Sequence, residues 1–148
     1  MPRLLGIDYG ERRIGLALSD PTATIAQSLP TLERRRGKRP PVMAILRLIH
    51  EHDVVAVVLG LPLTSAGTES AWTREVRRFG DAIAARSGRP VHYVDERMTS
   101  ARAQRAVRAI GLPRSRRREK GRVDAAAAVL ILQAHLDQRR ITNQETDE

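Results

Sequence analysis

Short apolar runs separated by turn residues occupy the first part of the chain, a pattern typical of antiparallel strands. Residues 3–9 and 12–19 form a predicted hairpin, and a third short strand is predicted at about 26–32. The continuous, largely β-branched run at 54–60 favours a parallel strand that is covered on both faces. Another short buried strand is predicted at 91–94. The pattern therefore predicts five strands of mixed direction.

Segments with apolar residues at helical spacing alternate with the later strands. They are a helix that starts at the proline pair 40–41, a long helix at about 68–87, a helix from Thr99 or Ser100 to about 110, and a last helix at about 122–138. Residues 111–121 form a basic linker. We expect one domain over residues 1–141, long enough for a full core, and a polar, disordered tail over 142–148.

This order of elements predicts an α/β fold. Three antiparallel strands come first, parallel strands alternate with helices afterwards, and helices cover both faces of one mixed five-stranded sheet. In such sheets, ligands bind beyond the carboxyl ends of the parallel strands. Asp8, the stretch 60–62 and the pair Asp95-Glu96 all fall at predicted strand ends. We expect them to converge at one edge of the sheet, where Gly60 and Pro62 shape a supporting loop.

Three carboxylates are candidates for a catalytic site at that edge. Asp8 ends an apolar strand and has glycines around it, so a ligand can approach closely, although Asp and Gly are also common turn residues. Glu96 ends another strand, and its neighbour Asp95 competes for the same role. Asp124 opens the last helix, where an acidic residue also complements the helix dipole.

Together, three carboxylates in one place repel each other unless a cation compensates them. Carboxylate oxygens suit Mg²⁺ or Mn²⁺, whereas a chain with no cysteine and four scattered histidines disfavours zinc. Metal ions bridged by a carboxylate suit phosphodiester hydrolysis, because one activates water while the other stabilises the leaving oxygen. The pattern indicates a nuclease.

The charge balance agrees with an anionic partner. The formal net charge is +9 and the sequence pI is about 11.3, which favours nucleic acid. Aromatic residues are scarce, so contact with the phosphate backbone is favoured over base stacking. No apolar run reaches the length of a membrane span, and we expect a cytoplasmic protein.

Basic residues near the carboxylates are candidates for nucleic-acid binding. A run before Asp124 can follow a phosphate backbone, although such charge blocks are often simply solvated. Arg97, beside Glu96, holds either a phosphate or a structural salt bridge. The candidates are Arg97, Arg116, Arg117, Arg118, Lys120 and Arg122, with Gly10, Gly60, Pro62 and Asp95 in supporting loops.

Several motifs resemble one known family, the YqgF/RuvX family of pre-16S rRNA nucleases. They cover nearly the whole chain in the family's order, and the Asp-Glu-Arg-x-Thr-Ser stretch is the most specific. The motifs are Gly6-Ile7-Asp8-Tyr9-Gly10 with residues 12–20, Val58-Leu59-Gly60-Leu61-Pro62-Leu63 with Gly67-Thr68-Glu69, Asp95-Glu96-Arg97-Met98-Thr99-Ser100, and Lys120-Gly121-Arg122-Val123-Asp124 with residues 125–127.

The resemblance implies an RNase H-like fold, similar to resolvases of the RuvC type, and metal-dependent cleavage in trimming the 5′ end of the 16S rRNA precursor. It also implies that Asp8 bridges the metal ions and that Glu96 and Asp124 are further ligands. The partner would be precursor rRNA, with structured DNA and a pre-ribosomal particle as further candidates, and the protein would be a monomer or homodimer.

Three alternatives stay open at this point. A phosphotransferase of the actin and sugar-kinase type uses a similar Asp-Gly hairpin, but those proteins need two such domains. A nuclease that resolves DNA junctions shares the chemistry and differs in substrate. A non-catalytic nucleic-acid-binding module shares the fold and lacks the reaction.

Overall fold

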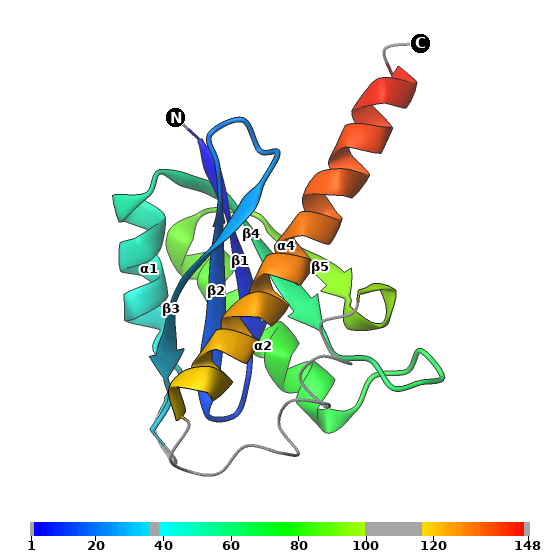
Figure 1. Ribbon diagram of the computed structural model, residues 1–148. Coiled ribbons are helices and arrows are strands. Elements are labelled where there is room, and N and C mark those ends of the chain that lie inside the picture. The colour runs from blue at the N-terminus through cyan, green and yellow to red at the C-terminus, as the bar shows by residue number, and fades with distance from the viewer. Residues whose placement is uncertain (1, 36–38, 100–116, 147–148) are drawn as a thin grey trace.

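A computed structural model describes residues 2–35, 39–99 and 117–146 of the chain, and within the last range the side chains of residues 125–145. The described residues form one five-stranded sheet with the strand order β3-β2-β1-β4-β5 (Figure 1). The strands are β1 Arg3–Tyr9, β2 Arg13–Ser19, β3 Ala26–Glu33, β4 Val54–Leu61 and β5 Val91–Asp95. β1 and β3 pair with β2 in antiparallel fashion, whereas β4 is parallel to β1 and β5. The predicted mixed sheet is confirmed.

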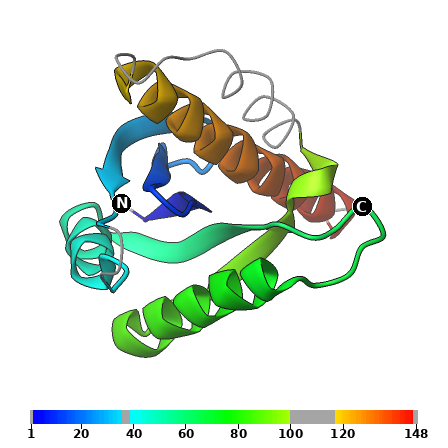
Figure 2. The same cartoon turned by 90° about the horizontal axis from the view of Figure 1, so that it is seen from below.

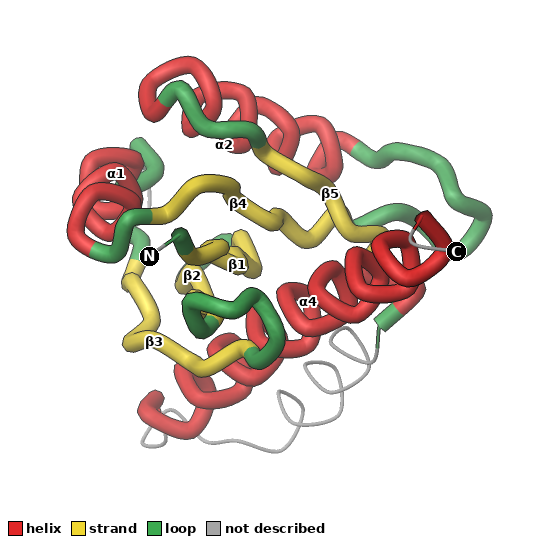
Figure 3. The backbone as a smooth tube through the Cα atoms, turned by 90° about the horizontal axis from the view of Figure 1, so that it is seen from above, coloured by secondary structure: helices red, strands yellow, loops and turns green. Residues whose placement is uncertain are grey.

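Helices cover both faces of this sheet, as the sequence predicts. They are α1 Val42–Glu51, α2 Ala71–Ser87 and α4 Arg117–Thr146, with one turn of 3-10 helix, η1 Glu96–Met98, after β5. Figures 2 and 3 show α1 and α2 on one side of the strands and α4 across the other. The C-terminal part of α4 continues beyond the sheet (Figure 1).

The two faces follow from the alternation of side chains along β1. Leu5 and Ile7 belong to the apolar core under α1 and α2. Leu4, of the opposite parity, belongs to the core under α4. Gly6 shares that parity, and a Cβ atom added there would lie 2.6 Å from Leu132 Cβ of α4. Glycine therefore lets α4 lie directly on β1, and the alternation puts Asp8 on the same face.

The loop after β4 is fixed to the start of α2. Ser70 is the N-cap of α2, its hydroxyl accepts from the Thr73 backbone N–H, and the Thr73 side chain accepts from the backbone of Ser70. The Thr73 hydroxyl also donates to the carbonyl of Pro62 at 2.6 Å. This capping network holds the end of β4 in place without using any residue of the carboxylate site.

Some boundaries differ from the predicted ones. α4 begins at Arg117, before the predicted start at 122, and it continues to Thr146. Residues 142–146, expected in a disordered tail, therefore extend this helix. The helix predicted from Thr99 or Ser100 to about 110 lies outside the described residues. Within the described ranges, none of the helices combines the length and apolar character that a bilayer crossing requires.

Candidate active site

Asp8 is a buried carboxylate near the end of β1. It lies opposite Gly15 of β2, and only 2% of its surface is exposed. Its neighbours of the same parity, Leu4 and Gly6, both meet α4. Removing an ionised carboxylate from water costs several kcal/mol unless the surroundings compensate the charge. A carboxylate buried at this position therefore has to be compensated by the groups or ions around it.

Glu96 is the second buried carboxylate, 3% exposed, at the first position of η1. Its Oε1 atom lies 2.9 Å from the place that a Cβ atom on Gly60 would occupy. The same Cβ atom would lie 2.6 Å from Ile131 Cδ1 of α4. Because residue 60 is glycine, the Glu96 carboxylate can lie over β4 beneath α4.

The two carboxylates are neighbours on one face of the sheet. Ile7 of β1 pairs with Leu59 of β4, so the next residues, Asp8 and Gly60, lie at the same level on adjacent strands. Adjacent strands are about 4.8 Å apart. Asp8 lies on the face of the sheet that α4 covers, and the Glu96 carboxylate lies over Gly60 on that same face. The predicted convergence of Asp8 and Glu96 at one edge agrees with this geometry.

The third predicted carboxylate, Asp124, belongs to α4, but its side chain lies outside the described residues. Position 124 is one helical turn before Ala128, whose carbonyl oxygen is 3.2 Å from the place of a Gly6 Cβ atom. Residues four apart lie on the same side of a helix, so the backbone of α4 carries position 124 along its sheet-facing side. Among the described residues, no group of three His, Cys, Asp or Glu side chains could hold a metal ion.

Arg97 is committed to contacts within the protein. Its Nη2 atom lies 2.7 Å from Asp95 Oδ2, its Nε atom contacts both oxygens of that carboxylate, and its backbone N–H donates to Asp95 Oδ1. Hydrogen bonding to Asp95 raises the pKa of the Arg97 side chain. The structural salt bridge considered for Arg97 is thus present, while phosphate binding stays a prediction. Asp95 pairs with Arg97, so Glu96 is the carboxylate that faces Gly60.

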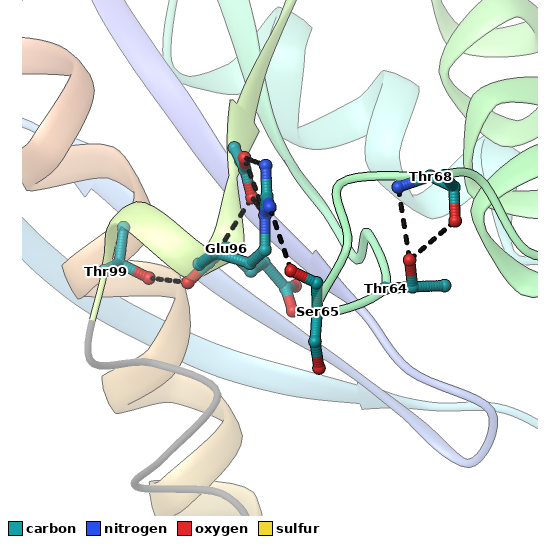
Figure 4. A network of polar contacts seen from close by, with 7 residues as sticks. Thr64, Ser65, Thr68, Glu96 and Thr99 are labelled. Carbon is teal, nitrogen blue, oxygen red and sulfur yellow. Dashed lines mark hydrogen bonds and ion pairs between the residues drawn. The ribbon is translucent and has the colours of Figure 1, made fainter.

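The loop after β4, next to Arg97 and Asp95, contains a tight turn at residues 64–68. Thr64 and Thr68 bond to each other through backbone and hydroxyl groups, and Figure 4 shows them next to Ser65. The Ser65 carbonyl accepts from Arg97 Nη1 at 3.3 Å. Gly67 has a φ of +82° and lies against the same guanidinium, and this backbone conformation favours glycine. On the other side, the Thr99 hydroxyl donates to the Glu96 carbonyl (Figure 4).

Gly10 and Arg34 shape the β1–β2 hairpin next to Asp8. A Cβ atom on Gly10 would lie 2.5 Å from the Arg13 carbonyl oxygen, so the tight turn requires glycine. Arg34 Nη1 donates to the Gly10 carbonyl at 2.8 Å, and its guanidinium lies 4.5 Å from the centre of the Tyr9 ring. Burial raises the pKa of Tyr9, and Arg34 opposes that rise. Sequence analysis missed Arg34, because nothing in a run of arginines marks the one that packs on an aromatic ring.

The basic candidates before Asp124 lie outside the part of the chain whose side chains are described. Arg116 lies outside the described residues, and so do the side chains of Arg117, Arg118, Lys120 and Arg122. Their predicted contact with a phosphate backbone stays a prediction.

Two resolvases are among the solved structures with a similar architecture. RuvC from T. thermophilus in complex with a Holliday junction substrate superposes on this chain with a TM-score of 0.60 at 19% identity. The superposition covers 95% of this chain and 96% of the RuvC chain. The fowlpox virus resolvase in complex with Holliday junction DNA gives a TM-score of 0.53 at 11% identity, over 92% of this chain and 97% of its own. The strand order and these likenesses define a protein with an RNase H-like fold.

Sequence relatives narrow that class to one family. The RuvX family model, described as Holliday junction resolvase, matches residues 2–138. A protein of Koribacter versatilis (strain Ellin345) named "Putative pre-16S rRNA nuclease" is 41% identical over 143 residues, 97% of this chain and 92% of the relative. A protein of the same name from Chloroflexus aggregans (strain MD-66 / DSM 9485) is 42% identical over 137 residues, 93% of this chain and 94% of the relative. The chain belongs to the RuvX family, and its class of enzyme is a nuclease, a hydrolase.

Proposed function

We propose that this chain is an endonuclease that depends on a divalent metal ion and hydrolyses phosphodiester bonds with Asp8, Glu96 and Asp124. The observation that carries the proposal is the pair of carboxylates, Asp8 and Glu96, buried side by side under α4. Two carboxylates in such a place suit a shared divalent cation, which compensates their mutual repulsion.

Mg²⁺ or Mn²⁺ fits the donor set, because hard divalent cations prefer carboxylate oxygens. When bound, such an ion activates water and stabilises the leaving oxygen of the phosphodiester. Asp8 and Glu96 would hold it, and Asp124 would add the third carboxylate from α4. Gly60 keeps the space for Glu96 open. Arg97 neutralises Asp95, so that Asp95 does not compete for the cation.

The substrate that we propose is the precursor of 16S rRNA, cut at its 5′ end during ribosome assembly in the cytoplasm, with a pre-ribosomal particle as the setting. The names of the relatives from Koribacter and Chloroflexus support this choice. The net charge of +9 suits any long polyanion and does not select between RNA and DNA.

A four-way DNA junction is the second candidate substrate. The description of the family model and the two resolvase complexes favour it. Cleavage of precursor rRNA and of a junction, measured side by side with the same enzyme preparation, separates the two. Faster cleavage of the junction would replace the first proposal.

The test of the chemistry compares Asp8→Asn and Glu96→Gln with Asp81→Asn, a matched change of an exposed aspartate on α2. We expect the first two to lose more than about 100-fold in cleavage rate with Mg²⁺ or Mn²⁺, since changes in mere partners of metal ligands already cost 10–100-fold. Asp81→Asn should keep the rate. Equal cleavage by Asp8→Asn and the unaltered enzyme would refute the assignment, because the cleavage would then come from other residues or from a contaminating nuclease.

A second readout does not depend on catalysis. A bound ion stabilises the folded state by mass action, so Mn²⁺ should raise the melting temperature of the unaltered protein. Asp8→Asn should reduce that rise, and Asp81→Asn should keep it.

A further inference from the structure

A pocket lies between α1 and α2, on the opposite face of the sheet from Asp8 and Glu96. Its volume is about 560 Å³, and its walls come from residues 39–43 and from α2. Figures 2 and 3 show these two helices side by side, away from α4. Arg86 joins the two walls, because its Nη2 atom donates to the sulfur of Met43 at 3.0 Å. A pocket of this size is typical of sites for small organic groups.

The walls of this α1–α2 pocket combine an apolar floor with a basic rim. Pro40, Pro41, Val42, Phe79 and Ala82 line it with apolar groups, and Phe79 is only 3% exposed. Arg39, Arg78 and Arg86 are exposed on the rim, where Glu75 is the acidic lining residue. The first turn of α1 contains no acidic residue to offset these arginines.

On α2, positions 75, 78, 82 and 86 recur at helical spacing, so they share one side of the helix. That side holds two of the three rim arginines around a small residue, Ala82. The arrangement is therefore set by the rigid helix and does not depend on a loop. A guanidinium carries five N–H donors, so the bond from Arg86 to Met43 leaves others for a ligand.

An apolar floor and a basic rim match a ligand that is apolar on one side and anionic on the other. An unpaired nucleotide has this character, because its base packs on apolar surface while its phosphates meet arginine. A duplex turns its bases inward and offers the pocket mainly phosphates and sugars, which leaves the floor unused. The net charge of +9 favours nucleic acid as the source of the anion.

We propose that the α1–α2 pocket binds an unpaired nucleotide of the nucleic-acid substrate, at a place separate from the catalytic carboxylates. The proposal rests on the proposed function for the identity of the substrate. The proposal requires a substrate with a single-stranded segment. That segment would pass over α1 and α2, while another segment of the same substrate reaches the carboxylates on the α4 side of the sheet.

The first test measures binding of fluorescein-labelled oligouridylate over a range of KCl concentrations, in the Asp8→Asn background so that the RNA stays intact. Arg78→Ser with Arg86→Ser removes two rim charges. Arg139→Ser with Arg140→Ser, two exposed arginines near the end of α4, is the matched control. Each phosphate contact on a single strand contributes about −0.7 to the slope of log K against log salt. We expect the pocket variant to flatten the slope by about 1.4 and the control to leave it unchanged.

The second test addresses the floor. Ala82→Glu places a carboxylate in the pocket, and Ala85→Glu makes the same change at an exposed position of α2 that does not line it. Alanine and glutamate are both good helix formers, so both variants should fold. We expect Ala82→Glu to weaken oligouridylate binding more than binding of an RNA duplex, because the single strand loses both the floor and the rim contacts, while Ala85→Glu does not change the ratio of the two affinities.

Two outcomes would overturn the proposal. In the first, the pocket variants and their controls bind oligouridylate with equal affinity and equal slope. In the second, labelled polyglutamate binds and loses affinity in the pocket variants while RNA binding is unchanged, which would assign the pocket to an acidic polypeptide. Neither outcome touches the catalytic proposal, whose failure is cleavage by Asp8→Asn and is measured separately.

Discussion

Both faces of the sheet carry an apolar core, and they differ in what is buried beside that core. Under α1 and α2, large residues such as Leu5, Ile7 and Ile83 are fully buried. Under α4, small residues such as Gly6 and Gly60 let the helix come close, and two carboxylates are buried among them. Tight packing of apolar groups stabilises the fold on both faces, and the glycines of the α4 face also leave room for the carboxylates. Both faces therefore contribute to stability, whereas the buried carboxylates lie on the α4 face.

Ile83→Ala is the change with the largest expected effect on stability. Ile83 of α2 is 1% exposed in the core of the α1–α2 face, and truncation of a buried isoleucine to alanine costs about 3 kcal/mol. Urea unfolding should show that loss. The cleavage rate per folded molecule should stay unchanged, because the site lies on the other face. A rate that fell in proportion to the stability would show that the two faces are not independent.

Compared with Ile83→Ala, Gly60→Ala should cause a smaller loss of stability and a larger loss of cleavage activity. The new methyl group would meet Ile131 Cδ1 and Glu96 Oε1 within 3 Å, and overpacking of this kind costs about 1–3 kcal/mol. Displacing the Glu96 carboxylate should reduce cleavage by roughly 100-fold, as a shift of about 1 Å in a catalytic group can do.

A double variant separates these two effects. Ile131→Val removes the Cδ1 atom that the added methyl group would meet first. Gly60→Ala with Ile131→Val should therefore recover most of the stability, measured by urea unfolding, and little of the cleavage rate. Recovery of both would mean that the contact with Glu96 is unimportant.

The sequence was sufficient for the architecture, whereas the catalytic roles of Asp8 and Glu96 stay a prediction. Apolar periodicity marks strands and helices directly, and residues at the carboxyl ends of parallel strands share an edge whatever the details of packing. It also implied the family, and the comparisons confirm that resemblance.

Other features depend on contacts between distant segments, which no local pattern records. The extra turns of α4 before 122 are one example, since a basic, glycine-containing stretch lacks the apolar spacing that predicts a helix. The contact of Arg97 with the Ser65 carbonyl is another, because the two residues lie far apart in the sequence. The α1–α2 pocket was not predicted for the same reason: its walls meet only in the folded chain.

Arg97→Gln tests whether the edge of the sheet needs its salt bridge. The ion pair of Arg97 with Asp95 is partly exposed, so the free energy of unfolding should change by less than about 1 kcal/mol. Arg97 also ties β5 to the loop at Ser65, and we expect the loss of that tie to reduce kcat roughly tenfold. KM and the salt dependence of binding should change little. A raised KM with a flatter salt slope would instead make Arg97 a phosphate ligand.

The smallest expected effect is a pH dependence of stability that comes from His135 on the α4 face. Its ring stacks on His92 of β5 with centroids 5.1 Å apart. Burial lowers the pKa of His135, and the nearby His92 and Arg139 lower it further. In the folded state the neutral form is therefore favoured, while the unfolded chain takes up a proton below about pH 6.5. Stability should fall as the pH drops from about 6.5 towards the lowered pKa.

The loss should be below about 1 kcal/mol, because the side chain is only half-buried and solvent screens the charges. Urea midpoints measured above and below pH 6.5 would show it. His135→Gln should remove most of the difference, whereas His50→Gln, an exposed histidine on α1, should keep it. If His50→Gln removed the difference instead, the proton-linked step would belong to the α1–α2 face and not to His135 on the α4 face.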